Sequence, residues 1–392
     1  MLTLLKNCHL VSPELELRQA SLLLQDAWIK DILPAGTPLP EADRTYDLAG
    51  EITVPGFIDI HCHGRGGADF CDGTPAAFNT IGRGKLAEGV TGFLATTMTV
   101  DIERLEATFA AAADYRRHPA GAKLLGIHLE GPFINPDCVG AQNPDFLRQP
   151  DIALIDRLNR VCPIRKVSFS PELPGGIDFC RALSERGIMP SGAHSAADYS
   201  LFKTAAATGM KHLTHFCNVM TPVHHLRFGM VGGGLLANDV YVEIIADGIH
   251  LCPEMIELIF NLKTADRVML ITDAMRGSAM PDGNYDLGGL PVSVVNGKAQ
   301  LANGAVAGST LQLHQALRRT AEITGLPLTE LIKTTAWNQA ASLHFAKAGK
   351  LAKGYRADIV ILNEQFEPQA VWLDGQLQNE NAVKDILPQI NQ

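Results

Sequence analysis

The chain has 392 residues, of which 46% are hydrophobic, a formal net charge of −9 and a pI near 5.8. This length suffices for one large α/β domain and a smaller one, and the acidic balance argues against a nucleic-acid-binding protein. No stretch reaches the roughly 18 apolar residues of a membrane-spanning helix, and Met1–Lys6 lacks the apolar core of a secretory signal. Eight scattered cysteines without a CxxC pair indicate reduced thiols. We expect a cytoplasmic protein that binds neither nucleic acid nor membranes.

Both ends of the chain are rich in short β-strand patterns. Residues 1–54 contain alternating runs such as 20–29, and the segments 357–362 and 369–375 also have strand character. The simplest packing joins the two ends. We therefore predict a small β-sandwich domain made of residues 1–54 and 348–392, beside a larger domain of residues 55–347.

The middle of the chain repeats a short apolar strand, a polar residue at its end and a helical stretch. Eight strands are predicted: 57–61, 92–96, 124–129, 166–170, 188–191, 212–216, 241–245 and 268–272. Amphipathic helices are predicted between them at 102–115, 152–161, 177–186, 199–208 and 253–263. This alternation predicts parallel βα units, and reactive side chains at most strand ends favour a (β/α)8 TIM barrel. The alternative, a doubly wound sheet, would gather its site at one switch point.

The first of these strands ends in His61 and His63, which are two residues apart. Side chains two apart on a strand point to the same face, so both imidazoles can reach one divalent metal ion. The alternative is a pair of polar loop residues.

The third strand ends at Glu130, which Gly131 and Pro132 follow. A carboxylate that leaves an apolar strand is costly unless it meets a cation, so we predict a metal ligand and not an exposed loop glutamate. His128 lies on the same face but deeper, and we predict a hydrogen-bonded core histidine.

The fifth to eighth strands also end in histidines or carboxylates, among them His194, His215 and Asp273. His212 should face away from His215 because successive side chains of a strand alternate. Asp273 can take the proton of a water that the metal activates and later protonate a leaving nitrogen. A further metal ligand or a structural cap are the alternatives for Asp273.

Several segments together resemble the amidohydrolase superfamily, and more closely the N-acetylglucosamine-6-phosphate deacetylase family with its sister enzymes for N-acetylgalactosamine 6-phosphate. They are PGFIDIHCHG (55–64), HLEGPFIN (128–135), GAHS (192–195), THFCNVM (214–220), ADGIH (246–250), LITDAM (270–275) and AGSTL (307–311). The HLEGP and ADGxH combination is specific, whereas HxH is common to the superfamily.

The resemblance implies a role for each residue. One divalent ion is held by Glu130, His194 and His215, a second by His61 and His63 with Glu130 as the bridge, and Asp273 is the catalytic base; Asn218, the backbone at Val219 and His250 contact the sugar phosphate. The resemblance also implies a homodimer. We expect one or two divalent ions, zinc before iron, manganese or cobalt, because imidazoles and carboxylates suit all of them.

Two positions depart from the family pattern. Gln142 stands where the family has a histidine that polarises the acetamide carbonyl, and it can donate a hydrogen bond but cannot carry charge. Leu226 stands where the family has a phosphate-binding arginine, and Arg227, one place later, is the candidate replacement.

The expected function is metal-dependent hydrolysis of the acetamide of an N-acetyl amino-sugar 6-phosphate, N-acetylglucosamine 6-phosphate first, with release of acetate. Gln142 or His250 would help the metal stabilise the oxyanion. The departures motivate a second hypothesis, the same hydrolysis of an unphosphorylated or different N-acyl substrate. A catalytically silent binding protein is the third.

Overall fold

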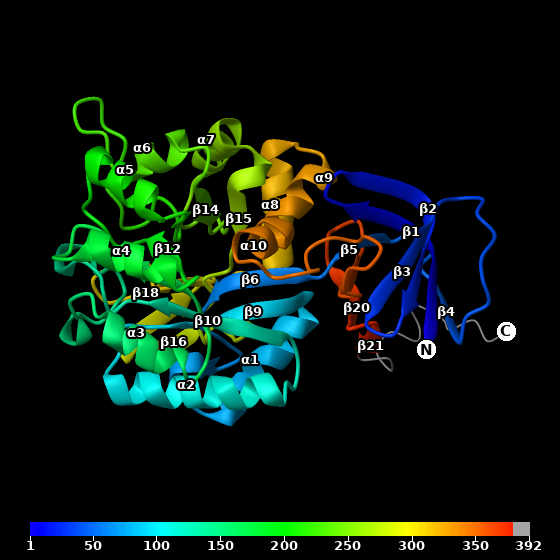
Figure 1. The fold of residues 1–392 in the computed structure, drawn as a ribbon, viewed down its shortest axis with the longest axis horizontal. Coiled ribbons are helices and arrows are strands. Elements are labelled where there is room, and N and C mark those ends of the chain that lie inside the picture. Colours follow the sequence, from blue (N-terminus) through cyan, green and yellow to red (C-terminus); the bar gives the residue numbers. More distant parts are fainter. Residues whose placement is uncertain (379–392) are drawn as a thin grey trace.

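The computed structural model describes residues 1–378, which form a barrel and a smaller β-domain (Figure 1). The barrel sheet has the order β6–β9–β10–β11–β12–β13–β14–β15, and every neighbouring pair is parallel. Its strands are β6 (Phe57–Cys62), β9 (Val90–Thr97), β10 (Lys123–Glu130), β11 (Ile164–Phe169), β12 (Met189–Gly192), β13 (His212–Leu213), β14 (Tyr241–Ile244) and β15 (Val268–Leu270).

The sheet closes on itself between its first and last strands. The backbone N–H of Asp273 donates to the carbonyl of His61 at 2.9 Å, and Cys62 pairs with Ala274 in a parallel bridge. The barrel prediction is therefore confirmed, and the doubly wound alternative is excluded. All eight predicted strands are present, but the sixth, predicted over 212–216, comprises only His212–Leu213, and the eighth, predicted over 268–272, ends at Leu270.

Helices surround the barrel (Figure 1). They are α1 (Pro75–Ala87), α2 (Ile102–Arg117), α3 (Ile152–Asn159), α4 (Gly176–Glu185), α5 (Tyr199–Thr208), α6 (Met230–Leu236), α7 (Pro253–Lys263), α8 (Leu313–Thr324), α9 (Leu328–Leu331) and α10 (Trp337–Ser342). Short 3-10 turns are η1 (Phe70–Asp72), η2 (Pro136–Cys138), η3 (Pro144–Phe146), η4 (Ala265–Arg267) and η5 (Ile332–Thr335).

Side-chain caps fix where several of these helices begin. Asp101, Asp151 and Asp198 each accept a hydrogen bond from a backbone N–H in the first turn of α2, α3 and α5. The five predicted helices are present, with ends that differ by up to two residues. Among residues 1–378, no helix combines the length and the apolarity that crossing a bilayer requires.

Strands from both ends of the chain form the smaller β-domain, which lies beside the barrel (Figure 1). Its sheet has the order β3–β2–β1–β5–β19–β20–β21, and β4 also pairs with β1. The strands are β1 (Leu2–Ser12), β2 (Leu15–Gln25), β3 (Trp28–Leu33), β4 (Arg44–Asp47), β5 (Ile52–Pro55), β19 (Ile359–Leu362), β20 (Pro368–Leu373) and β21 (Gln376–Gln378).

This sheet folds back on itself around its own core. The N–H of Ile29 on β3 donates to the carbonyl of Tyr355 just before β19, and the buried rings of Tyr46 and Trp372 pack edge to face. A small β-domain made from both ends is thus confirmed. Within the predicted segment 348–392, residues 379–392 lie outside the described part of the chain, and the boundaries after residues 54 and 347 stay predictions.

A three-stranded antiparallel sheet follows β15 and was not predicted. It consists of β16 (Gly283–Leu287), β17 (Leu290–Val295) and β18 (Lys298–Gln300), and a two-stranded ribbon, β7 (Gly64–Arg65) and β8 (Ala68–Asp69), follows β6. The alternation of Leu290, Val292 and Val294 before Asn296-Gly297 is a hairpin signal that could have located the sheet.

A buried ion pair lies where the barrel closes. Lys85 Nζ donates to Asp59 at 2.8 Å and to Thr272 at 3.1 Å, and none of the three is exposed. Glu88 is a second partner of Lys85 at 2.9 Å. This cluster links β6 to the segment that carries Asp273.

Replacing Lys85 with Met should destabilise the protein by about 3–5 kcal/mol, because the buried carboxylate of Asp59 then loses its cation, whereas Glu88 keeps Arg65 as a partner. Urea unfolding measures the change, and Lys30→Met at an exposed position is the control, with an expected change within about 0.5 kcal/mol. A loss below about 1 kcal/mol for Lys85→Met would contradict this assignment.

Candidate active site

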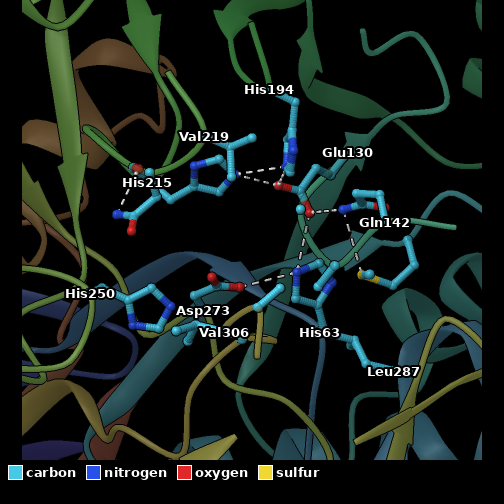
Figure 2. A pocket seen from close by; sticks show the side chains of 16 residues that line it. His63, Glu130, Gln142, His194, His215, Val219, His250, Asp273, Leu287 and Val306 are labelled. Carbon is cyan, nitrogen blue, oxygen red and sulfur yellow. Dashed lines mark hydrogen bonds and ion pairs between the residues drawn. The ribbon is translucent and has the colours of Figure 1, made fainter. Parts of the chain in front are cut away.

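A pocket of about 260 Å³ opens at the carboxyl ends of the barrel strands. Figure 2 shows side chains from different strand ends pointing into it, with His63, Glu130, His194, His215 and Asp273 around its floor. His61 does not line the pocket but lies against His63, with 3.2 Å between their Nε2 atoms, and is fully buried. The structure thus brings together side chains that lie up to 212 residues apart in the chain, from His61 to Asp273 (273 − 61).

One group of donor atoms comes from His61, His63, Asp273 and Glu130. His61 Nε2 and His63 Nε2 lie 3.2 Å apart, and they lie 3.3 and 3.2 Å from Asp273 Oδ1. The same two nitrogens lie 3.6 and 3.3 Å from Glu130 Oε2. We call this four-donor group site A.

A second group uses the other oxygen of Glu130. His215 Nε2 lies 3.1 Å from Glu130 Oε1 and 3.0 Å from His194 Nε2, and His194 Nε2 lies 3.5 Å from Glu130 Oε1. We call this three-donor group site B. Glu130 therefore offers one oxygen to each site.

The spacing of these atoms fits divalent metal ions. Zinc bonds of about 2.0–2.1 Å in a tetrahedron place neighbouring donors about 3.3–3.4 Å apart. The separations between neighbouring donor atoms in both sites lie between 3.0 and 3.6 Å. Site A has four protein donors, whereas site B has three and leaves a position for water or substrate, which is the pattern of a catalytic ion.

Hydrogen bonds and backbone conformation orient these side chains. His194 Nδ1 lies 2.9 Å from the carbonyl of Cys138, so Nδ1–H donates and Nε2 keeps its lone pair for a metal. His194, His215 and Asp273 have φ of 45°, 33° and 50°. Such left-handed conformations cost about 1–3 kcal/mol each in non-glycine residues and cluster at functional sites. Here they mark the points where the chain leaves the barrel strands.

The remaining predicted residues line the wall of the pocket. Gln142 Nε2 donates to Glu130 Oε2 at 2.8 Å, and its Oε1 accepts from the N–H of Thr99 at 2.8 Å. His250 Nδ1 lies 2.7 Å from Asp247 Oδ2, which fixes the ring at the pocket edge.

The loop after His215 supplies Asn218 and Val219 to the pocket. The side-chain amide of Asn218 donates to the carbonyls of His215 and Phe216, so it holds the loop on which it lies. Val219 has φ of 53°, which turns the chain at the pocket wall.

Comparisons with known proteins agree with this geometry. A model of the amidohydrolase family matches residues 52–377. The chain belongs to the amidohydrolase family. It is 39% identical to the N-acetylglucosamine-6-phosphate deacetylase of Lysinibacillus sphaericus over 321 residues, which cover 81% of this chain and 83% of that protein. It is 35% identical to the N-acetylgalactosamine-6-phosphate deacetylase of Escherichia coli O157:H7, over 92% of this chain and 98% of the relative.

Solved structures of N-acetylglucosamine-6-phosphate deacetylases are also similar to this chain. The N-acetylglucosamine-6-phosphate deacetylase of Thermotoga maritima is 31% identical, with a TM-score of 0.87 over 95% of this chain and 99% of that one. A mutant enzyme from Mycobacterium smegmatis in complex with N-acetyl-D-glucosamine-6-phosphate is 30% identical, with a TM-score of 0.89 over 96% of this chain and 98% of that one. The chain is therefore placed with these deacetylases inside the amidohydrolase family.

Arg227 is the predicted site residue that this amidohydrolase does not bring to the pocket. It lies in an exposed loop that folds on itself, since its N–H donates to the carbonyl of His224, and the neighbouring Leu226 is 78% exposed. Among the residues that the structure describes, no arginine or lysine lines the pocket.

Some pocket residues were missed by the sequence analysis. Leu287 comes from the unpredicted sheet, and Met98, Ala305 and Val306 come from loops without a chemical motif. A hairpin signal could have pointed to Leu287, but apolar loop residues carry no signal of their own.

Negative charge dominates the electrostatics of site A. Burial lowers the pKa of His61 and of His63, but the carboxylates of Asp273 and Glu130 outweigh it and raise the pKa values to about 9 and about 10. Burial raises the pKa of Glu130, but the charge of His61 and hydrogen bonds from His194 and His215 hold it well below its ordinary value. The two carboxylates favour positive charge between them. In the metal-free protein this charge comes from the protonated imidazoles of His61 and His63.

Binding of a divalent ion at site A should therefore release protons. At pH 7 His61 and His63 are protonated in the metal-free protein, because their pKa values lie above 7, so an ion must displace about two protons. Zinc affinity should rise from pH 6 to pH 8. Calorimetric titration in buffers of different ionisation enthalpy measures the release, and a heat that is independent of the buffer would contradict it.

The shared carboxylate should be needed for both ions. Glu130→Gln removes the charge between the sites and should weaken binding at both by at least the roughly 10- to 100-fold that loss of a mere hydrogen-bond partner of a ligand costs. Metal analysis after equilibrium dialysis measures this, with His250→Asn, which lies outside both donor sets, as the control. Loss of only one ion would show that Glu130 does not bridge.

Proposed function

We propose that this protein is a metal-dependent deacetylase that hydrolyses the acetamide of N-acetylglucosamine 6-phosphate to glucosamine 6-phosphate and acetate. The observation that carries the proposal is the pair of donor sets that share Glu130 beside Asp273. Relatives and structural neighbours named for this reaction, and one named for the galactosamine epimer, support the substrate class.

A divalent ion bound here would lower the pKa of a water molecule and polarise the amide carbonyl. Asp273 accepts the proton of that water and passes it to the leaving amine. Burial raises the pKa of Asp273, but the charge of His61 and the hydrogen bond from His63 outweigh it and lower the pKa below its ordinary value. The carboxylate is thus ionised at neutral pH and ready to accept the proton.

The pocket wall positions the substrate. The pocket volume of about 260 Å³ lies just below the roughly 300–1,000 Å³ usual for small-molecule sites, which favours one sugar ring over an oligosaccharide. Gln142 keeps the shared carboxylate in place through its 2.8 Å hydrogen bond. His250, held by Asp247, presents its other nitrogen to the substrate. Asn218 and Val219 contribute the loop that faces the sugar, and Arg227 would reach the phosphate only after its loop moves.

The proposed ion is zinc, because the donor spacing suits tetrahedral coordination, and each chain would bind two. Iron, manganese and cobalt bind the same types of donor and are the alternatives. We also propose that the protein is a homodimer and is located in the cytoplasm. Free cysteines, most of them buried, support a reducing compartment, and the family resemblance supports the dimer. We also propose domain boundaries after residues 54 and 347.

Purified protein should release acetate from N-acetylglucosamine 6-phosphate, lose this activity on chelation and regain it with zinc. Asp273→Asn should lower kcat by about 10²- to 10⁴-fold, the size of a general acid–base contribution. Coupled acetate detection measures both. Absence of acetate with any of the four metals would favour a silent binding protein, and full activity of Asp273→Asn would remove the assigned base.

A second substrate class is favoured by one observation: the described part of the chain places no arginine or lysine in the pocket. An unphosphorylated N-acetyl sugar needs no such partner. Comparing kcat/KM for the phosphorylated and free sugars of both epimers distinguishes the two proposed substrate classes. The leading proposal predicts at least about a tenfold preference for the phosphorylated sugar, equal to about 1.4 kcal/mol. Similar values for the two would support the second class.

A further inference from the structure

An ion pair lies in the barrel interior below the site and has no part in the mechanism above. Lys166 on β11 donates to Oε1 of Glu243 on β14, and neither side chain is exposed. Burial of two charges costs several kcal/mol per ion, and a well-packed apolar pair is often at least as stable. Stability alone therefore does not account for this pair.

The free oxygen of Glu243 faces a metal ligand. Glu243 Oε2 lies 3.5 Å from His61 Nδ1, and both atoms are buried without a hydrogen-bond partner among the described residues. His61 must keep Nε2 unprotonated to bind an ion, so its proton belongs on Nδ1. A shift of a few tenths of an ångström would turn this contact into a hydrogen bond.

Among residues 1–378, His61 Nδ1 has no hydrogen-bond partner, and its contact with Glu243 Oε2 is an acidic one. The ring of His128 packs edge-on against His61, and as predicted His128 is a core histidine, bonded to Thr96 at 3.2 Å and to Ser168 at 2.7 Å. His212 is buried and its Nδ1 lies 3.5 Å from Glu243 Oε1, on the other side of the carboxylate.

We infer that Glu243, held by Lys166, is a positioning residue that fixes the ring and the proton of His61 and so sets the metal affinity of site A. This inference rests on the proposed two-ion centre. Site B does not depend on the pair, because His194 is oriented by the carbonyl of Cys138 instead. The predicted effect is therefore confined to one of two neighbouring sites, which a general loss of stability cannot imitate.

The double variant Lys166→Met/Glu243→Leu tests this without leaving a buried charge unpaired. Metal-free protein is titrated with zinc in a calorimeter, and the affinities of the two sites are compared with wild type. We expect site A to weaken about 10- to 100-fold, the usual effect of removing the partner of a ligating histidine, and site B to stay unchanged. Lys333→Met/Glu330→Leu, which removes a buried lysine and a partner 3.0 Å away, is the matched control and should change neither affinity.

Unchanged affinity at site A in the folded double variant, or equal weakening of both sites, would overturn the inference. Binding of only one ion by the wild-type protein would also overturn the inference. The proposed function is tested separately, by the acetate assay. If the double variant does not fold, ¹⁵N-histidine NMR of zinc-loaded wild type decides. A slowly exchanging Nδ1–H signal that disappears in His61→Asn is expected, and its absence would overturn the inference.

Discussion

The shared carboxylate of Glu130 is the constraint on which the rest of the site depends. A buried carboxylate is tolerated only where cations surround it, and this one lies within 3.6 Å of four imidazole nitrogens. Its two oxygens face different donor sets, so the position of one side chain fixes both. Glu130 ends β10, which pairs in parallel with β9 and β11 and has one register shift on each side before the segment that leads to Glu130. The barrel backbone therefore holds both donor sets in fixed positions.

The scaffold holds this arrangement through several buried polar contacts. Lys85 and Asp59 tie the first strand to Thr272, which precedes Asp273. Gln142 reaches from a loop to Glu130, and the left-handed turns at His194 and His215 aim their rings at the same carboxylate. The buried charges would be costly without their partners, and the left-handed conformations are strained. The site therefore contains strained backbone and buried charges, and the stability of the apolar barrel offsets their cost.

Much of this was predictable from the sequence because strands impose a simple geometry. The two-residue spacing of His61 and His63 fixed their common face, and the position of Glu130 before Gly-Pro indicated a side chain at a strand end. Burial of His128 followed from the same alternation. The alternation of eight apolar strands with helices, together with the reactive side chains at most strand ends, predicted the barrel.

Other features depend on tertiary contacts that no local pattern encodes. The hydrogen bond between Gln142 and Glu130 joins a loop to a strand, and the contact of Glu243 with His61 joins β14 to β6. The outward position of Arg227 follows from how its loop folds on itself. The positive φ of His194, His215 and Asp273 has no sequence signal, because glycine does not mark those positions.

Anomalous diffraction from crystals of the zinc-loaded protein tests the central claim most directly. Two zinc peaks about 3.5–4 Å apart, with one oxygen of Glu130 on each, are predicted, as in other two-metal centres. A single peak, or two peaks too far apart for one carboxylate to reach both, would contradict the account.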